Sequence, residues 1–207
     1  MNNQALYDVS YGMYAIGVKD GIRDCGCIVN TIFQVSTIGP LIALSMNKQN
    51  YTCDCILKNQ CFSVSVLPEN IDSKVITQLG FQSGKDHNKW ENIEHHSFKD
   101  LPIVDGAIGY FVCKVEKTME AQTHVVFLAR VIEAEKINNE KPMTYAYYHD
   151  VVKGSAPKNA PTYQPEEKWV CSVCGFVYDG KDFALEPDNY VCPVCGAKKE
   201  MFKKQER

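Results

Sequence analysis

The sequence has no long apolar run and no excess of basic charge. None of its hydrophobic segments approaches the roughly 20 residues that a membrane-spanning helix needs. The net charge of −3 gives no electrostatic reason to expect nucleic acid as a partner. The first residues, MNNQALYDVSYGMY, lack the basic and apolar regions of a secretory signal. We therefore expect a cytoplasmic protein that binds neither membrane nor nucleic acid.

Dinucleotide-binding glycines are also missing, whereas cysteine is abundant. No G-x-G-x-x-G segment follows a first strand, which excludes a Rossmann-type dinucleotide site. Of the ten cysteines, six lie upstream of the last forty residues, at Cys25, Cys27, Cys53, Cys55, Cys61 and Cys113. We expect these six to remain thiols that pack as small hydrophobic side chains. A disulfide between Cys25 and Cys27 would be strained, because only one residue separates them. So many thiols favour an anaerobic host.

Residues 1–151 have the pattern of a mainly β domain. The 207 residues, of which 45% are hydrophobic and 23% charged, suffice for one packed domain and a small module. Alternating and β-branched segments predict strands at 11–18, 27–35, 41–46, 61–67, 107–116 and 124–134. The last segment is too continuously apolar for a solvated edge, so we expect it inside a sheet. Helical patterns occupy 50–59 and 70–79. Because the connections are too short for repeated crossover helices, a β-barrel is favoured over a doubly wound sheet.

Residues 152–167 separate this domain from a short C-terminal module. They include three prolines together with small and charged residues, which is typical of an extended linker. The remaining residues, 168–207, are too few to bury a core that is stable by itself. A metal ion is therefore expected to hold this module together.

Two C-x-x-C pairs, Cys171 with Cys174 and Cys192 with Cys195, form a strong metal-binding pattern. Each pair is followed directly by glycine. In such a turn the backbone N–H groups point at the sulfurs, and two turns supply four thiolates in tetrahedral geometry. Iron and zinc both suit this ligand set, and a structural zinc ribbon has the same spacing. The spacing by itself leaves both metals open.

The C-terminal module resembles rubredoxin. The resemblance rests on C-x-x-C-G-x-x-Y-D at 171–179, on C-P-x-C-G at 192–196, and on the acidic segment between them. It implies one mononuclear iron that carries single electrons, with zinc as the alternative. The segment between the two pairs is shorter than in free-standing rubredoxins and closer to the shortened rubredoxin tails of fusion proteins.

Several polar residues of the first domain suggest a phosphate site. Ser45 and Asn47 end an apolar strand, and Thr52 follows at the start of a helix, where free N–H groups stabilise an anion. Lys85 adds a positive charge on a loop after Gly84. Each residue also has an ordinary alternative, because serine and asparagine commonly cap helices and a lysine is commonly just solvated.

The whole first domain resembles the flavin-reductase-like FMN-binding split barrel, and within it the flavoredoxin group. The matching residues lie at 26–36, 40–48, 62–67, 81–86 and 123–124. The resemblance implies FMN in a groove at a homodimer interface. By the same resemblance, the isoalloxazine would be lined by Asn30, Thr31, Val35 and Ser36, and the phosphate would be held by Ser45, Asn47, Thr52 and Lys85.

His124 corresponds to a histidine that lies near the flavin in that family. Its surroundings differ from the family pattern, since Gln122 and Thr123 precede it and Ala129 stands where glycine is common. A strand histidine is also commonly a hydrogen-bonded core residue. His124 is therefore a candidate contact to the flavin or the nicotinamide, with a core role as the alternative.

The order of the two domains resembles the high-molecular-weight rubredoxins of anaerobic bacteria. That resemblance implies oxidation of NAD(P)H at FMN and delivery of single electrons through the iron to a flavodiiron protein or a similar acceptor. We therefore expect an NAD(P)H:flavin/rubredoxin oxidoreductase, because a flavin takes up two electrons and a mononuclear iron carries one. Two alternatives stay open: a non-enzymatic carrier that a separate reductase reduces, and a zinc-ribbon interaction module on an FMN-binding barrel.

Overall fold

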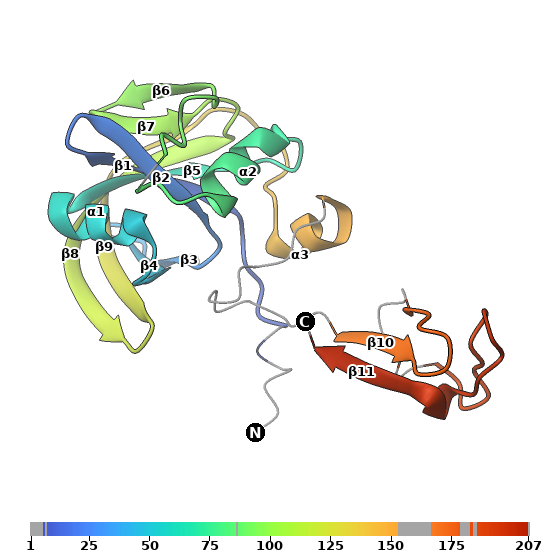
Figure 1. Ribbon diagram of the computed structural model, residues 1–207. Coiled ribbons are helices and arrows are strands. Elements are labelled where there is room, and N and C mark those ends of the chain that lie inside the picture. Colours follow the sequence, from blue (N-terminus) through green and yellow to red (C-terminus); the bar gives the residue numbers. More distant parts are fainter. Residues whose placement is uncertain are drawn as a thin grey trace. The chain divides into compact units, whose positions relative to one another are not determined.

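The computed structural model describes residues 6, 8–85, 87–152, 167–178, 183 and 186–206 (Figure 1). The chain divides into two compact units, Met1–Gly154 and Ser155–Arg207. The predicted linker at 152–167 falls, except for its two end residues, outside the described residues. Over the described part of the chain, no helix combines the length and the apolar character that a membrane crossing requires.

A curved seven-stranded antiparallel sheet forms the first unit, which confirms the prediction of a mainly β domain (Figure 1). Its strands are β1 (Tyr14–Asp20), β2 (Arg23–Val29), β3 (Ile32–Ser36), β4 (Leu41–Asn47), β5 (Cys61–Val66), β8 (Gly109–Ala121) and β9 (His124–Lys136). They are hydrogen-bonded in the order β2-β1-β5-β8-β9-β4-β3. The apolar strand β9 lies between β8 and β4, as its continuous hydrophobic pattern predicts.

The prediction of one strand over residues 27–35 is wrong. The chain leaves β2 after Val29, and β3 begins at Ile32 on the opposite edge of the sheet. Asn30 and Thr31 make this crossing, and pairing with β4 begins at Thr31, whose carbonyl accepts a hydrogen bond from Ser45 N over 3.0 Å. Asn30, a common turn residue, stands at this break, but the apolar residues on both sides of it continue the strand pattern.

Two helices flank the sheet, close to their predicted positions. α1 (Tyr51–Asn59) begins where the Asn50 side chain accepts a hydrogen bond from Thr52 N. α2 (Ser73–Phe81) begins three residues later than expected, because the Asp72 side chain accepts a hydrogen bond from Lys74 N and so sets its start. A single helical turn, α3 (Tyr145–Tyr147), and a π-helical turn at Tyr148–Val152 end the unit.

The sequence pattern did not predict the short hairpin of β6 (His95–Phe98) and β7 (Leu101–Val104). β6 has the sequence HHSF, which lacks an alternating apolar pattern. β7 is nevertheless buried along its whole length. The chain reverses between the two strands at Lys99 and Asp100, both of which have positive φ angles.

Two hydrophobic clusters hold the first unit together. One cluster lies inside the curved sheet and under α1, and its fully buried side chains include Ile16, Leu44 and Phe127. The second packs α2 and Trp90 against the outside of β2. Gly26 permits this second contact, since a Cβ there would lie 2.8 Å from Trp90 Cζ2 and 2.2 Å from a backbone oxygen.

The second unit is a small module built on one antiparallel pair, β10 (Glu167–Cys171) and β11 (Phe202–Glu206). A 3-10 turn at Lys199–Met201 precedes β11. Among its described residues, the buried core comprises Phe183, Phe202 and two of the cysteines, with further aromatic side chains packed around them. Such a small core agrees with the expectation that this module needs a metal ion.

Candidate functional site

The two C-x-x-C pairs form two turns with matching hydrogen bonds. In the first turn, Cys171 N donates to Phe176 O and Gly175 N donates to Cys171 O; in the second, Cys192 and Gly196 make the equivalent bonds. Both glycines have positive φ angles, 76° at Gly175 and 72° at Gly196. This left-handed backbone explains why glycine follows each pair, because side chains with a Cβ rarely adopt it.

The four cysteine sulfurs lie within 4.8 Å of one another. The Sγ atoms of Cys171 and Cys195 are 3.7 Å apart, and those of Cys174 and Cys192 are 3.6 Å apart. A tetrahedral ion with metal–sulfur bonds of about 2.3 Å requires sulfur–sulfur edges of about 3.8 Å. The arrangement therefore fits one tetrahedral metal ion without rearrangement.

The four sulfurs differ in their exposure. Cys171 and Cys192 are buried against the aromatic core, whereas Cys174 and Cys195 are exposed. Burial by itself raises the pKa of Cys171, but N–H groups of Cys174 and Val173 donate to its sulfur and bring that pKa down to about 7. An electron at this site would reach the surface through the exposed pair.

The aromatic residues of this module pack on one another beside the metal site. Phe183 lies at the centre, with its ring stacked 4.8 Å from Trp169 and tilted 4.7 Å from Phe202. Tyr190 packs edge-on against both phenylalanine rings. This packing gives the sulfurs an apolar support that a bare pair of metal-binding turns would lack.

In the first unit, strand pairing brings several predicted cofactor residues together. Thr31 and Ser45 meet across β3 and β4, where Thr31 Oγ1 donates to Ser45 O over 2.7 Å. Asn47, at the end of β4, is paired in register with His124, the first residue of β9. All four side chains are at least half-buried, and they lie at the end of β4 that leads into α1.

His124 is buried and its Nδ1 lies 2.8 Å from Thr123 Oγ1. Burial lowers the pKa of His124, so the imidazole is neutral at pH 7. A neutral ring has one nitrogen that donates and one that accepts a hydrogen bond. The side chain is thus set up as a hydrogen-bonding group and not as a cation.

The loop that carries Lys85 lies against the start of α1. A Cβ on Gly84 would stand 3.8 Å from Tyr51 Cδ1, in the first turn of the helix. Lys85 itself is exposed, and its backbone N–H donates to Ser83 Oγ. The loop that carries this lysine therefore adjoins the positive end of α1, which is a suitable arrangement for a phosphate.

Thr52 is placed differently from the expectation of an exposed phosphate ligand. Its side chain is buried, its N–H donates to Asn50 Oδ1, and its Oγ1 lies 3.7 Å from Cys25 Sγ. Its contact with a phosphate stays a prediction that would require the hydroxyl to turn outward.

Lys89 was not predicted from the sequence as a site residue, and it is buried although it is charged. Its Nζ donates to Leu79 O, near the end of α2, over 2.6 Å. Desolvation lowers the pKa of Lys89, while the neighbouring thiols Cys27 and Cys25 act in the opposite direction. The one feature of the local sequence that could have indicated the burial of Lys89 is its position directly before Trp90, which is itself buried.

Val35 and Ser36 lie at the far end of β3 from Thr31, where Ser36 pairs with Leu41. At the usual rise of a strand, five residues span roughly 16 Å. The residues predicted to line one cofactor therefore extend along the whole edge strand. Val35 is exposed there, as are its neighbours Phe33 and Ile38.

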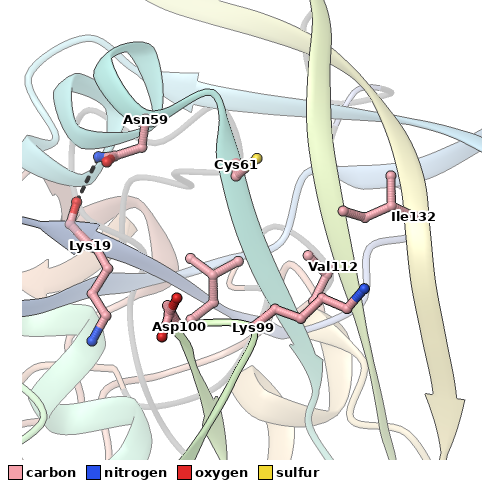
Figure 2. A pocket seen from close by; sticks show the side chains of 8 residues that line it. Lys19, Asn59, Cys61, Lys99, Asp100, Val112 and Ile132 are labelled. Carbon is pink, nitrogen blue, oxygen red and sulfur yellow. Dashed lines mark hydrogen bonds between the residues drawn. The ribbon is translucent and has the colours of Figure 1, made fainter.

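A separate pocket of about 190 Å³ lies at the other end of α1 (Figure 2). Among its lining residues are Lys19, Cys61 and Lys99, and Asn59 Nδ2 donates to Lys19 O within it. None of the predicted cofactor residues lines this pocket. It does contain Cys61, the one upstream cysteine that is not buried.

Comparison with protein families gives one match for each unit. Residues 6–155 match the flavin reductase like domain. Residues 169–203 match the rubredoxin-like domain of rubrerythrin. Together the two matches cover nearly all of the described chain.

Two curated relatives cover most of the chain. High molecular weight rubredoxin of Moorella thermoacetica is 36% identical, over 98% of this chain and 99% of that protein. Ferric-chelate reductase (NAD(P)H) of Archaeoglobus fulgidus is 32% identical, over 79% of this chain and 98% of that protein.

Solved structures show the same fold for the first unit. NADH:FAD oxidoreductase of Streptomyces globisporus has a TM-score of 0.64 at 19% identity and covers 69% of this chain and 85% of that chain. FMN-binding protein from Thermus thermophilus has a TM-score of 0.57 at 23% identity, over 62% of this chain and 73% of that chain. These structures confirm the predicted flavin-reductase-like barrel.

Proposed function

Because the chain belongs to the family of high-molecular-weight rubredoxins, with a flavin reductase-like domain followed by a rubredoxin-like domain, we propose that it oxidises NAD(P)H at bound FMN and passes single electrons to an iron at its four C-terminal cysteines. Membership of this family means that the chain is a flavin- and iron-dependent electron-transfer oxidoreductase. The observation that carries the proposal is the joining of a flavin-type barrel to a preformed tetrathiolate site.

The phosphate of FMN would bind where β4 leads into α1. Ser45 and Asn47 offer polar side chains at the strand end, and Lys85 offers a positive charge beside the helix start. An FMN phosphate is a dianion, so it would gain from both the ammonium group and the positive end of the helix. Among these residues, Lys85 supplies the net charge that a neutral ligand would not require.

The isoalloxazine would lie along β3. Asn30 and Thr31 mark one end of this strand, and Val35 and Ser36 mark the other. When bound, FMN takes up a hydride as two electrons and releases them singly. The protein's own task is to position the nicotinamide against the flavin, and the buried, neutral His124 would donate or accept one hydrogen bond there.

The four cysteines would hold the iron, with zinc as the alternative. Cys174 and Cys195 are exposed and would form the surface through which electrons leave, to a flavodiiron protein or a similar acceptor. Val173 and Val194, next to them, are also exposed and present an apolar rim to that acceptor.

A homodimer would cover the exposed edge of β3. Phe33 is 66% exposed and Ile38 is 95% exposed, and both lie on or beside this strand at the end of the sheet. An apolar edge strand is ordinarily covered or paired in native proteins. Since β3 also carries the residues expected to line the isoalloxazine, the flavin would lie at the dimer interface.

Anaerobic stopped-flow mixing tests the relay. The full chain, loaded with FMN and iron, is mixed with NADH or with NADPH, and the absorbance of flavin and iron is followed separately. The same iron-loaded chain without flavin is the matched control. We expect the iron absorbance to bleach only in the flavin-loaded chain and after the flavin absorbance falls.

Two other outcomes would favour the alternatives. If the iron bleaches no faster with flavin than without it, the relay is wrong; bleaching by a separate reduced electron-transfer protein would then identify a non-enzymatic carrier. If metal analysis of the protein finds zinc in place of iron, the C-terminal module is a structural ribbon.

A further inference from the structure

Two of the upstream cysteines meet in the structure, although they are 30 positions apart in the sequence. Cys25 lies on β2 and Cys55 on α1, and both are buried. The Cys55 thiol donates a hydrogen bond to Cys25 Sγ, with the two sulfurs 3.7 Å apart. Because a disulfide has a sulfur–sulfur bond of about 2.05 Å, a closure of roughly 1.7 Å would join them.

The neighbouring thiols are placed differently. Cys27 lies on the same face of β2 as Cys25 but faces the side chains of Thr52 and Asn50. Cys53 is two residues from Cys55 on α1 and so points away from it. Among the described residues of the first unit, Cys25 and Cys55 are the one pair of sulfurs within hydrogen-bonding distance.

Cys25 has polar groups beside its sulfur. Besides the Cys55 thiol, Thr52 Oγ1 lies 3.7 Å from this sulfur. The buried side chain of Lys89 passes close by, since a Cβ on Gly84 would lie 3.3 Å from Cys25 Sγ and 3.4 Å from Lys89 Cδ. The Cys25 sulfur is therefore held among polar neighbours and beside a second thiol.

Cys55 is the donor of the pair. Burial, together with the neighbouring Cys25, raises the pKa of Cys55 to about 12. Its sulfur therefore keeps its proton and donates a hydrogen bond to Cys25. The geometry thus directs one thiol at the sulfur of the other.

We propose that Cys25 and Cys55 are a dithiol couple that hydrogen peroxide oxidises to a disulfide between β2 and α1. The Cys25 sulfur attacks one peroxide oxygen, the O–O bond breaks, and the departing hydroxide takes the Cys25 proton and leaves as water, while Cys25 becomes a sulfenic acid. The Cys55 sulfur then attacks the Cys25 sulfur, the S–O bond breaks, and the hydroxyl leaves with the Cys55 proton as a second water. Two thiols and one peroxide give one disulfide and two waters.

The disulfide would join α1 to β2 beside the buried Thr52. If the phosphate of FMN binds at this end of α1, oxidation would also change the affinity for FMN; that consequence rests on the proposed function. The disulfide itself does not, because every residue that supports it is placed without the cofactor.

Peptide mapping of the peroxide-treated full chain tests the proposal. After treatment of the native protein, free thiols are alkylated under denaturing conditions and the chain is cut with trypsin. Cleavage after Arg23, Lys48 and Lys58 releases one peptide with Cys25 and Cys27 and another with Cys53 and Cys55. We expect these two peptides to become cross-linked, with a mass two hydrogen atoms below their sum.

Variants assign the bond. In the double variant Cys27→Ser/Cys53→Ser each peptide holds a single cysteine, so a cross-link between them joins Cys25 to Cys55. We expect this variant to cross-link as the unaltered chain does, and Cys25→Ser and Cys55→Ser to lose at least nine-tenths of the product, roughly a tenfold fall. Oxidation of the half-exposed Cys61 without any cross-link between the two peptides would overturn the proposal, and so would a cross-link that persists in Cys25→Ser.

Discussion

Asn47 and His124 stand opposite each other in the antiparallel register of β4 and β9, although they are 77 positions apart in the chain. This pairing places Asn47, one of the residues predicted to hold the phosphate, next to the buried, neutral imidazole of His124. The next residue along, Lys48, continues the contact, since its N–H donates to Thr123 O. The juxtaposition of these polar residues is therefore set by strand register.

His124 makes the stability of the first unit depend on pH. Burial lowers the pKa of His124 in the folded state, so below about pH 6.5 the unfolded chain binds more protons at this residue than the folded chain does. Stability is then lost as the pH falls through that region. The free energy of unfolding, measured with urea at about pH 7.5 and about pH 5.5, should fall less for His124→Gln than for the unaltered chain. The exposed His87 provides the matched control: His87→Gln should leave the loss unchanged.

Lys85→Gln should weaken FMN binding. The substitution keeps the length of the side chain but removes its positive charge, and a hydrogen bond to a charged group is worth roughly 1.5–3 kcal/mol. The dissociation constant should rise about tenfold to a hundredfold, as measured by quenching of flavin fluorescence. Lys74→Gln, at an exposed lysine of α2, should not change it. Equal affinities for the two variants would remove Lys85 from the phosphate site.

Cys192→Ser should abolish stable iron binding. The buried Cys192 is one of four sulfurs that together fit a tetrahedral ion, and a hydroxyl is a poor substitute for a thiolate. Metal analysis and the visible spectrum should show loss of iron while the flavin is retained. Cys61→Ser, at the half-exposed upstream thiol, should keep the full iron content. Normal iron content in Cys192→Ser would mean that the metal lies elsewhere.

Gly175→Ala should speed the loss of metal without preventing its binding. With φ at 76°, alanine at this position costs on the order of 1 kcal/mol of strain in the turn that carries Cys171 and Cys174. The rate of iron removal by a strong chelator should rise about fivefold. Gly80→Ala is the control, because that glycine lies inside α2, where a Cβ meets only ordinary contacts, and alanine favours a helix.

Phe33→Asp should disrupt the proposed dimer. A charged side chain in the middle of β3 would be buried without a partner in any interface that covers this edge, which costs several kcal/mol. Sedimentation should show a shift from dimer to monomer at micromolar concentration. Ile22→Asp changes a fully exposed residue in the β1–β2 turn and should leave the dimer intact. A monomer for the unaltered chain would contradict the proposal directly.

Features that depend on neighbours in the sequence were predictable from those residues alone. The two metal-binding turns are each complete within a few residues, so C-x-x-C-G determines both the ligands and the positive φ of Gly175 and Gly196. Four strands of the sheet, β1, β4, β5 and β8, were similarly predictable from their alternating pattern, and β9 from its continuous apolar run, whereas β2 and β3 were predicted as one strand. In these cases the neighbouring residues in the sequence were sufficient to predict the structure.

Contacts between distant segments were decided only by the tertiary structure. The sequence shows Cys25 next to Cys27, yet its sulfur meets Cys55, because β2 and α1 pack on each other and α1 turns that thiol inward. The burial of Thr52 and Lys89, and the separation of β2 from β3 to opposite edges, have the same origin. Metal ligation depends on short-range spacing in the sequence, whereas the grouping of the predicted cofactor residues and the thiol pair depend on long-range packing, which no local pattern determines.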